Sequence, residues 1–427
     1  MKMIQSGLRS QMRNTRLVFK LTTCRMCKGK NLKKVISLKP TPPANAFLTK
    51  ASLNKKEHFF PLEVNFCSDC GQLQLTHVVS PEVLFRDYVY VSSTSPVFVA
   101  HFQEYAQDLT TRFKLNKNSL VLDIGSNDGI LLRPLKQKGI KVLGVDPAIE
   151  IAKKATKEGL TTLPFFLDTK LAKQIVKRYG FADVVTANNA FAHINDLDEI
   201  VQSFKILTDQ NGVFVIEFPY LIDFIEKNYF DLIYHEHLSY LSIRSLHALF
   251  KRFDMEIFDA KKVFSHGGSL RVYVHKKGGN HKISPEVNNL LREETRSGLD
   301  KVETYKEFAK KIETNKNALS KILKKLKKEK KTIIGYGAPA KGNTLLIHFG
   351  IGKNILDYIV DDSPLKQGLF TPGTHIPVFP SSKILETKPD YILILAWNFA
   401  DSIIKKLSDY QNRGGSFIIP VPKPNIT

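Results

Sequence analysis

The sequence predicts an α/β protein with more than one domain, and three observations support that prediction. Regular alternation of strand and helix patterns begins at residue 119 and continues to about 275. A second α/β pattern begins at residue 331, after a long lysine-rich helical stretch at about 283–329. Four cysteines precede both patterns, in two closely spaced pairs. A chain of 427 residues is long enough to bury two or three hydrophobic cores.

The cysteines form two C-x2-C pairs, and the chain contains no fifth cysteine. Two such pairs can place four thiolates at the corners of a tetrahedron, the arrangement that structural Zn²⁺ requires. Two local redox pairs or four buried thiols are the alternatives. We predict a closed, structural zinc site whose ligands are Cys24, Cys27, Cys67 and Cys70.

The central motif of the chain is VLDIGSNDGILL, at residues 121–132. An apolar strand containing Asp123 ends at Gly125, and Gly129 opens an apolar helical pattern. This is a strand, a glycine turn and a helix N-terminus, a corner at which backbone can approach a ligand closely. The next strand ends at Asp146, where nucleotide-binding sheets place an acid for ribose hydroxyls. Asn127 replaces the middle glycine of the dinucleotide fingerprint G-x-G-x-x-G.

Seven strands are expected in this middle region, the first five parallel with helices between them. Their predicted ranges are 119–124, 141–146, 161–166, 182–188, 212–218, 256–263 and 269–275. Ligands of such sheets bind beyond the carboxyl ends of the strands. Those ends also supply Phe166 and the pair Asn188-Asn189. The two asparagines fit a cofactor contact and a cap of the next helix equally well.

The segment Tyr234-His235-Glu236-His237 follows the fifth strand, where a substrate would lie. His and Glu can transfer protons near neutral pH, which favours a functional interpretation over a polar loop. In an extended chain His235 and His237 would point together, with Glu236 on the opposite side. A zinc site here would lack a third spaced ligand. Upstream, Tyr88 and Tyr90 share a face if that loop is extended.

The C-terminal pattern contains GYGAPAKGN, which matches G-x-G-x-x-A between a strand and a helix. It includes Gly335, Gly337, Lys341 and Asn343. Backbone N–H groups at that helix start would accept a diphosphate, with added charge from the lysine. Asp361 ends the following strand, where a ribose partner would lie.

The net charge of +22 is compatible with an anionic partner. Lysines at helical spacing, however, usually form a solvated face. A nucleotide-linked substrate needs only a small local basic patch, so we consider nucleic acid an unlikely partner. No apolar run approaches the roughly 20 residues of a membrane span. The basic first twenty residues lack an apolar core, so we expect a cytoplasmic protein; a transit peptide is the alternative. The sequence carries no signal for oligomeric state.

Together these motifs resemble the nucleotide-sugar C-methyltransferases that make branched deoxysugars. The DIGSNDG and GVDPA stretches resemble motif I and its following acid in class I S-adenosylmethionine (SAM) methyltransferases. TANNAFAHI, EFPYL, YHEH, HGGSLRVY, GYGAPAKGN and VDDSPLKQG extend the resemblance from Cys24 to about Val421. It implies a zinc-binding N-terminal domain, a class I (Rossmann-like) SAM domain and a second Rossmann-like C-terminal domain. The basic N-terminal extension and the lysine content depart from the family pattern.

The resemblance divides the chain into five parts. They are a disordered basic start at 1–22, a zinc-binding domain at 23–84, a SAM-binding domain at 85–280, a helical connector at 281–330 and a nucleotide-sugar-binding domain at 331–427. It implies a nucleoside-diphosphate 4-keto-deoxysugar substrate, methylated at C3 through an enolate.

The resemblance also implies roles for individual residues. His237 would be the base, with Glu236, Tyr234 and Tyr90 as further catalytic residues. The expected SAM contacts are Asp123, Gly125, Asn127, Gly129, Asp146, Phe166 and Asn188. The expected substrate contacts are Tyr88, His235, Gly335, Gly337, Lys341, Asn343 and Asp361.

Three rival functions are less favoured by the sequence. A zinc-containing nucleic-acid methyltransferase acting at carbon 5 of a pyrimidine would need a catalytic cysteine outside the two pairs. An amino-methylating enzyme would carry an N/D-P-P-Y-like turn where this chain has ANNAF. An O-methyltransferase acting on a sugar or polyketide is the second rival. A noncatalytic scaffold, the third, would be expected to have lost motif I or YHEH, and both are intact.

Overall fold

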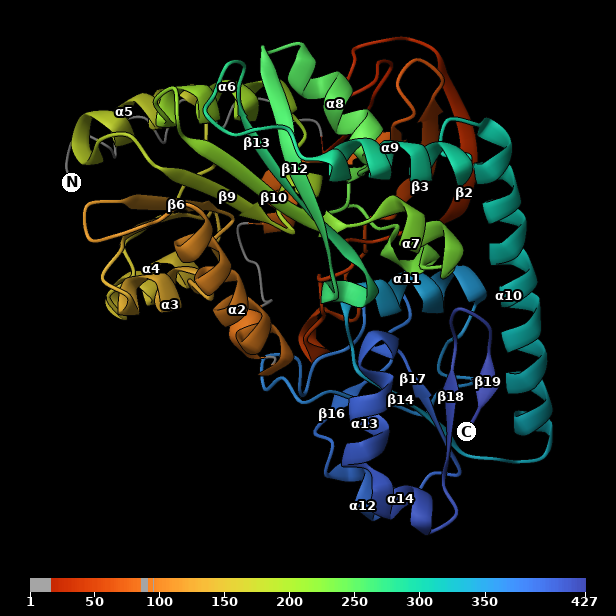
Figure 1. Cartoon of the computed structure of the whole chain (residues 1–427). Coiled ribbons are helices and arrows are strands. Elements are labelled where there is room, and N and C mark those ends of the chain that lie inside the picture. Colours follow the sequence, from red (N-terminus) through yellow and green to blue (C-terminus); the bar gives the residue numbers. More distant parts are fainter. Residues whose placement is uncertain (1–16, 86–90, 95) are drawn as a thin grey trace.

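A computed structural model describes residues 17–85, 91–94 and 96–427, and its largest element is a seven-stranded sheet (Figure 1). The strand order is β12-β13-β10-β9-β6-β7-β8, with β13 antiparallel to both of its neighbours. The strands are β6 (Leu120–Ile124), β7 (Lys141–Val145), β8 (Thr162–Leu163), β9 (Val184–Asn188), β10 (Val213–Pro219), β12 (Met255–Val263) and β13 (Ser269–Lys276). The strand expected at 161–166 contains only two residues. The other six expected strands are present, with ends that shift by at most two residues.

Helices cover both faces of this sheet, because alternate strand residues point to opposite sides. Val121, Val184 and Val215 pack in one cluster with apolar residues of α2 (Pro96–Arg112) and α3 (Leu132–Gln137). The intervening strand residues pack against α5 (Thr169–Tyr179) and α6 (Leu197–Leu207). In Figure 1, α2, α3 and α4 (Ile149–Lys157) lie below the sheet and α5 and α6 above it.

The N-terminal region contributes two smaller sheets. The first pairs β1 (Val18–Lys20) with β5 (His77–Val79), followed by the short helix α1 (Pro81–Phe85). We expected residues 1–22 to be disordered, and the strand at 18–20 contradicts this for those residues. The second sheet has the order β11-β4-β3-β2; its strands are β2 (Leu32–Thr41), β3 (Phe60–Cys67), β4 (Leu73–Leu75) and β11 (Ser239–Tyr240). Its edge strand β11 therefore comes from the middle of the chain.

The C-terminal region forms a second parallel sheet of order β16-β15-β14-β17-β18-β19, in which only β19 is antiparallel. Its strands are β14 (Ile333–Tyr336), β15 (Ile359–Val360), β16 (Val378–Phe379), β17 (Tyr391–Ile394), β18 (Ser416–Ile419) and β19 (Asn425–Ile426). Its helices are α11 (Ala340–Phe349), α12 (Lys383–Thr387), α13 (Ala400–Lys406) and α14 (Ser408–Asn412). The class I sheet and this second sheet confirm the predicted fold class.

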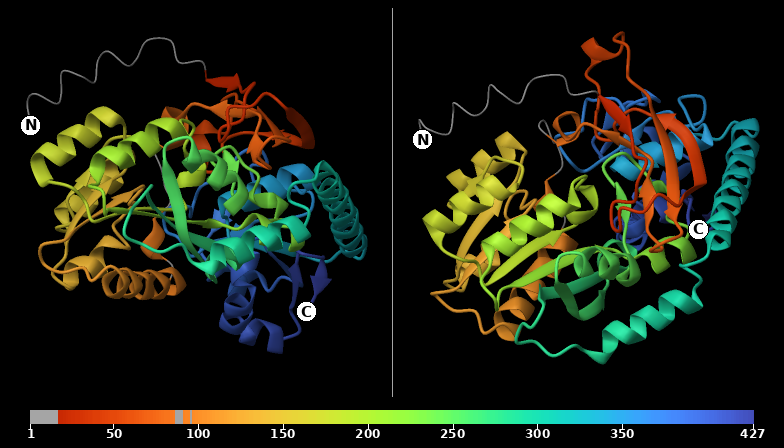
Figure 2. Two further views of the ribbon diagram at one scale, coloured as in Figure 1. Left: turned by 45° about the horizontal axis from the view of Figure 1, so that its top comes forward. Right: turned by 90° about the horizontal axis from the view of Figure 1, so that it is seen from above.

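The stretch expected as one helical connector contains two helices, α9 (Pro285–Arg296) and α10 (Val302–Lys328), separated by Gly298 at a φ of +70°. Both views of Figure 2 place α10 on the side of the molecule opposite α3 and α4. Its apolar face packs on two regions, with Tyr305 4.9 Å from Phe66 of β3 and Phe308 5.2 Å from Phe224 of α7 (Leu221–Glu226), measured between ring centroids. No helix in the described part of the chain is both long and apolar enough to cross a bilayer.

A buried ion pair fixes α2 to the sheet beside the ligand-binding edge. Arg271 of β13 donates through Nε and Nη2 to Oε2 of Glu217 at 2.9 and 2.8 Å. His101 of α2 bonds the other carboxylate oxygen at 2.7 Å, and Asp108 accepts from Arg271 Nη1 at 3.0 Å. Burial opposes the charge of Glu217, but His101 and Arg271 outweigh it and hold the pKa of Glu217 at about 2.

We expect Arg271→Met to lower the free energy of unfolding by about 3–5 kcal/mol, because Glu217 is then buried without its main partner. The folded-state pKa of Glu217 lies below its ordinary value of 4.5, so its stabilisation is complete above that pH and is lost as the pH falls toward 2. Urea unfolding at several pH values measures both effects. The matched control is Lys261→Met, which removes a half-exposed lysine 4.0 Å from Asp108. Equal midpoints for the two variants would contradict the prediction.

Candidate active site

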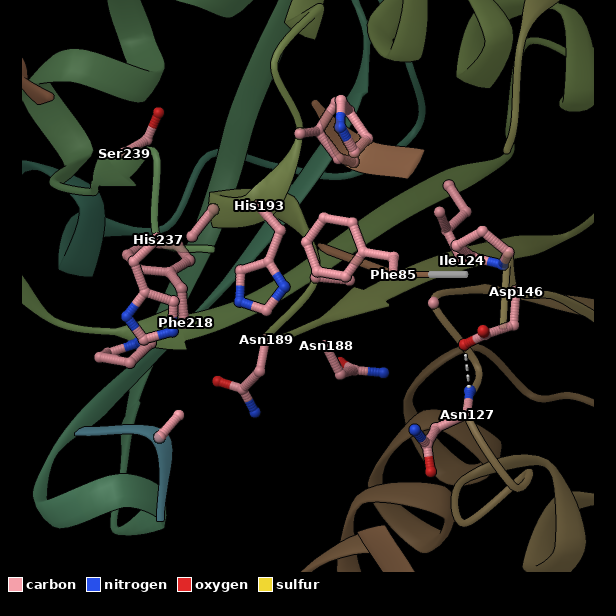
Figure 3. Close-up of a pocket in the computed structure, with 18 of the residues that line it drawn as sticks. Phe85, Ile124, Asn127, Asp146, Asn188, Asn189, His193, Phe218, His237 and Ser239 are labelled. Atoms are coloured by element: carbon pink, nitrogen blue, oxygen red, sulfur yellow. Dashed lines mark hydrogen bonds between the residues drawn. The ribbon is translucent and has the colours of Figure 1, made fainter. Parts of the chain in front are cut away.

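A cavity of about 620 Å³ lies beyond the carboxyl ends of β6, β7 and β9, where the parallel sheet was expected to bind its ligand. Its walls come from all three regions of the chain. The carboxyl ends of the central strands and the turns after them contribute Gly125, Asp146 and Asn188. The N-terminal region contributes Asn45, and the C-terminal region contributes Lys341. Figure 3 shows Asp146 and Asn127 at one end of this pocket and His237 at the other, with His193 and the two asparagines between them.

The turn after β6 needs its glycines. Gly125 has a φ of +69°, and a Cβ there would lie 2.6 Å from the Cβ of Ala190. Gly129 has a φ of +79°, and its Cβ would lie 2.3 Å from Leu160. Gly125 lines the cavity, whereas Gly129 does not and acts by letting the turn close. Asn127 also lines the cavity, at a φ of +50°, and accepts a hydrogen bond from the backbone N–H of Ser92 at 3.0 Å.

Asp146 lines the cavity, and the protein occupies only part of the hydrogen-bonding capacity of its carboxylate. Its Oδ2 accepts the backbone N–H of Asn127 and its Oδ1 that of Ala148, both at 2.8 Å. Burial raises its pKa, and these two N–H groups oppose that rise. A carboxylate oxygen can accept about two hydrogen bonds. One acceptor position on each oxygen is thus left for a pair of ribose hydroxyls, so the residue fits the nucleoside of SAM.

Asp123 does not line the cavity and acts through its neighbours. Burial raises its pKa to about 7, and it accepts hydrogen bonds from Thr186 Oγ1 at 2.6 Å and Asn188 Nδ2 at 3.2 Å. The side-chain oxygens of Asn188 and Asn189 have no hydrogen-bond partner among the described residues, although both are buried. Neither asparagine caps the following helical turn η4 (Phe191–His193), so the capping alternative is wrong. Their oxygens fit donors on a bound cofactor.

Phe166 lines the cavity next to Phe165, Leu167 and Ile200. This apolar section adjoins Asp146, where it suits a flat ring such as adenine. The residues present therefore fit SAM from the ribose to the base.

Tyr234 and His237 form a hydrogen-bonded pair on the opposite wall. His237 Nδ1 bonds the carbonyl oxygen of Leu232 at 2.8 Å, and a carbonyl can only accept, so Nδ1 carries the proton. Nε2 is then the acceptor, and the hydroxyl of Tyr234 donates to it at 2.9 Å. Burial lowers the pKa of His237 to about 4, so the imidazole is neutral at physiological pH. His193 stacks on it, with ring centroids 5.0 Å apart.

The other two residues of the YHEH motif face the N-terminal region. His235 bonds the carbonyl oxygen of Pro61 at 3.3 Å and packs edge-on against Phe60. Glu236 accepts a hydrogen bond from Asn45 Nδ2 at 2.7 Å. Neither lines the cavity. The segment is not extended but forms a turn, in which His237 N donates to the carbonyl of Tyr234 at 2.9 Å, so His235 and His237 do not point together.

Lys341 reaches the cavity from the first turn of α11, as expected for that motif. Its Nζ donates to Asn398 Oδ1 at 2.5 Å and lies 3.3 Å from the ring centroid of Trp397, in η7 (Trp397–Phe399). Asp231, in η5 (Phe230–Leu232), accepts from Trp397 Nε1 at 2.6 Å. Burial lowers the pKa of Lys341, and the charge of Asp231 counteracts this.

The remaining residues predicted around GYGAPAKGN do not line the cavity. Gly337 has a φ of +84° in the turn, and Gly335 lies within β14 against Ile359. Asn343 donates to the carbonyl of Ala44 at 2.7 Å, which joins the C-terminal and N-terminal regions. Asp361 accepts the backbone N–H groups of Ala338 at 2.6 Å and Ser363 at 2.8 Å, so it fixes the turn.

Sequence reasoning missed several residues of the cavity. Lys366, 7% exposed, lines it and donates to the carbonyl of Ala338 at 2.8 Å. Phe98 and Phe102 of α2 line it as well. For Lys366 the available clue was the family-like stretch SPLKQG; the two phenylalanines follow ordinary helical spacing and gave none. Tyr88 and Tyr90 lie outside the described residues.

The four cysteines converge as predicted, with all sulfurs within 4.8 Å of one another. Cys24 and Cys70 are 3.5 Å apart and Cys27 and Cys67 3.6 Å, measured between Sγ atoms. A zinc tetrahedron with bonds of about 2.3 Å separates its sulfurs by about 3.8 Å. The backbone N–H of Gly29 also points to Cys27 Sγ at 3.4 Å. The residues fit a closed Zn²⁺ site with no position for substrate.

Three family models match the chain in succession. A putative zinc binding domain matches residues 24–85, a methyltransferase domain residues 98–259 and a C-methyltransferase C-terminal domain residues 264–422. The C-methyltransferase NovU of Streptomyces niveus is 35% identical over 410 residues, which cover 96% of this chain and 98% of NovU. The chain belongs to this C-methyltransferase family. It is a SAM-dependent methyltransferase with a zinc-binding N-terminal domain, which confirms the resemblance seen in its motifs.

Other similarities are confined to parts of the chain. The ubiquinone biosynthesis O-methyltransferase of Pelagibacter ubique is 26% identical over 178 residues, 39% of this chain and 65% of that relative. Among solved structures, a SAM-dependent methyltransferase of Anabaena variabilis is 19% identical with a TM-score of 0.33, covering 41% of this chain and 84% of that one. Magnesium protoporphyrin IX methyltransferase of Synechocystis with bound SAM is 14% identical with a TM-score of 0.32, covering 42% and 82%.

For the C-methyltransferase described here, Asp146→Ala should weaken SAM binding by at least about 150-fold, because it removes two hydrogen bonds to a charged group that contribute roughly 1.5–3 kcal/mol each. Isothermal titration calorimetry with SAM measures the change. Asp183→Ala is the matched control, since Asp183 also accepts a backbone N–H, from Leu120 at 2.8 Å, but does not line the cavity. Unchanged SAM affinity in Asp146→Ala would mean that the ribose lies elsewhere.

Proposed function

We propose that this C-methyltransferase methylates carbon C3 of a nucleoside-diphosphate 4-keto-deoxysugar, next to the ketone. The observation that carries the proposal is the shared cavity. A SAM corner with Asp146, a neutral histidine that faces the cavity and a lysine at the start of a C-terminal helix all line it. SAM, when bound, supplies an electrophilic methyl group. The protein must then remove a proton from carbon and hold the rest of the substrate still.

His237 is placed to be the base. Its tautomer is fixed by the carbonyl of Leu232, which leaves Nε2 unprotonated. A carbon next to a ketone loses its proton only if the resulting enolate is stabilised, so the site needs a base at the carbon and a donor at the oxygen. Tyr234 supplies the donor. In the proposed complex its hydroxyl leaves Nε2 and turns to the keto oxygen, and Nε2 then meets the C–H bond.

The low pKa of His237 has a consequence for this step. At pH 7 an imidazole with a pKa of about 4 is ready to accept a proton, but its conjugate acid is about 4 kcal/mol too unstable to persist there. A diphosphate held nearby would raise this pKa by favouring the charged form. In the proposed mechanism substrate binding therefore brings the base closer to its best strength.

The C-terminal domain is the proposed holder of the diphosphate. α11 begins at Ala340, and Pro339, Ala340 and Lys341 line the cavity, so the positive end of that helix faces it. Lys341 adds a donor there; burial lowers its pKa, and a bound diphosphate would favour its charged form. Gripping the unreactive part of the substrate positions the reactive carbon, and positioning can supply roughly 7–11 kcal/mol of the barrier.

The rival functions receive less support. The O-methyltransferase relatives cover no more than 39% of this chain, whereas NovU covers 96% of it. A nucleic-acid substrate would need a basic surface leading to the cavity. The lysines of α10 instead lie on a helix on the outer side of the molecule, and none of them lines the cavity (Figure 2).

His237→Asn should stop deuterium uptake at the carbon next to the ketone of a 4-keto nucleotide sugar incubated in D2O without SAM, because the acceptor Nε2 is removed. NMR follows the exchange, and the affinities for SAM and the nucleotide sugar should change by less than about threefold. His247→Asn, an exposed histidine in α8 (Ile243–Lys251), is the control. Exchange at the wild-type rate in His237→Asn would rule out this base.

Lys341→Met should raise KM for the nucleotide sugar by roughly 10- to 150-fold and lower kcat much less, since it removes one charged contact with the diphosphate.

A direct probe of diphosphate binding is the fluorescence of Trp397, the only tryptophan of the chain. A plain nucleoside diphosphate should change it saturably in the native protein, because Lys341 Nζ lies 3.3 Å from that ring. Lys406→Met, whose lysine pairs with Asp362 outside the cavity, should behave as the native protein. If the fluorescence titration of Lys341→Met matches that of the native protein, Lys341 does not contact the diphosphate.

A further inference from the structure

The catalytic segment is built into the zinc-binding domain by a strand. β11, the pair Ser239–Tyr240, begins two residues after His237 and is the edge strand of the N-terminal sheet. It pairs antiparallel with β4, Ser239 opposite Gln74 and Tyr240 opposite Leu73. β4 itself begins three residues after the last cysteine. The four-cysteine cluster and the proposed base are therefore separated by one strand pair.

Leu238 connects this strand pair to the cavity. Its backbone N–H donates to the carbonyl of Ala192 at 2.9 Å, beside His193. Its carbonyl accepts the N–H of Leu75 of β4 at 3.0 Å. The residues on both sides of Leu238 line the cavity, since His237, Ser239 and Tyr240 all face it. A displacement of β4 would therefore move Leu238, the residue directly after His237.

Each C-x2-C pair forms one knuckle, the first at Cys24–Cys27 and the second at Cys67–Cys70. The first knuckle holds β4 by hydrogen bonds from Arg25. This arginine lies between the first two cysteines and is 3% exposed. Its backbone N–H donates to Gln74 Oε1 at 2.8 Å, and its Nη1 donates to the carbonyl of Leu75 at 2.9 Å. Gln74 returns a bond from Nε2 to the carbonyl of Thr23 at 3.1 Å. The second knuckle continues directly into β4, with Cys67 N donating to Gln72 O at 2.8 Å.

We propose that the metal-bound knuckles set the register of β4 and β11, and that Arg25 is the positioning residue that transmits this register to His237. The inference rests on the proposed function only for the role of His237. The two knuckles lie 39 residues apart in the chain, so a metal that joins them fixes β4 from both ends. Register matters here because a slip of one residue would turn each side chain of β11 to the other face.

Hydrogen–deuterium exchange of the holoenzyme tests the proposal without relying on activity. In Arg25→Met, zinc should stay at one per chain by metal analysis, while amides of residues 232–241 exchange at least about tenfold faster. Amides of the SAM turn, residues 119–146, and the affinity for SAM should be unchanged. Arg25→Lys, which can still donate to Leu75, should restore most of the protection. Lys28→Met is the matched control, because Lys28 lies in the same loop and pairs with Asp198 of α6 at 3.1 Å.

Removal of zinc from the native protein by a chelator is the second measurement, and it serves if Arg25→Met does not fold. Residues 232–241 should lose protection before residues 119–146. Unchanged protection of 232–241 in both experiments overturns the proposal, and so does simultaneous loss of protection throughout the chain. The proposed role of His237 and the proposed coupling can fail separately. If His237→Asn still exchanges the substrate proton, His237 is not the base. If the protection of residues 232–241 nevertheless depends on Arg25, the coupling stands.

Discussion

The site depends on a short segment, residues 231–241, that is hydrogen-bonded to all three domains at once. Asp231 accepts from Trp397, and Ile233 accepts from Thr344 at 3.1 Å, which fixes one end to the C-terminal domain. Glu236 and His235 bond the N-terminal domain, and Leu238 bonds Ala192 in the turn η4, which follows β9 of the central sheet. His237 therefore has little freedom to move relative to any wall of the cavity. Orientation of this kind is where much of the catalytic advantage of a preorganised site arises.

The sequence predicted those parts of the molecule that local pattern encodes. Apolar periodicity placed the strands of the central sheet, and strand–turn–helix chemistry placed the SAM corner, because both depend on residues near one another in the chain. The C-x2-C spacing predicted the cysteine cluster for the same reason. The length of β8 was overestimated, and the strand contains only two residues. The apolar residues after it, at 165–167, line the cavity and do not extend the strand.

The directions of polar side chains could not be predicted, because they depend on partners far away in sequence. His235 and Glu236 looked equivalent to His237, yet their partners Pro61 and Asn45 lie more than 170 residues earlier and draw them out of the cavity. Asn343 and Asp361 belong to a recognisable phosphate motif, and both are occupied by backbone groups. Lys366 shows the reverse case, a cavity residue whose position follows from the fold of the C-terminal domain alone.

Buried charge on the C-terminal side of the cavity gives the proposed substrate a physical rationale. Lys341 and Lys366 are both buried, and burial lowers the pKa of each, so the protein bears a cost for keeping them there. Lys366 and Asp361 hold the peptide of Ala338 from its carbonyl and N–H sides, which fixes the turn that leads into α11. The carboxylates of Asp231 and Asp361 offset part of that cost, and an anion that enters the site would offset more of it. A diphosphate would supply that anion and a neutral sugar would not, which supports the proposed binding of a nucleotide-linked substrate by the C-terminal domain.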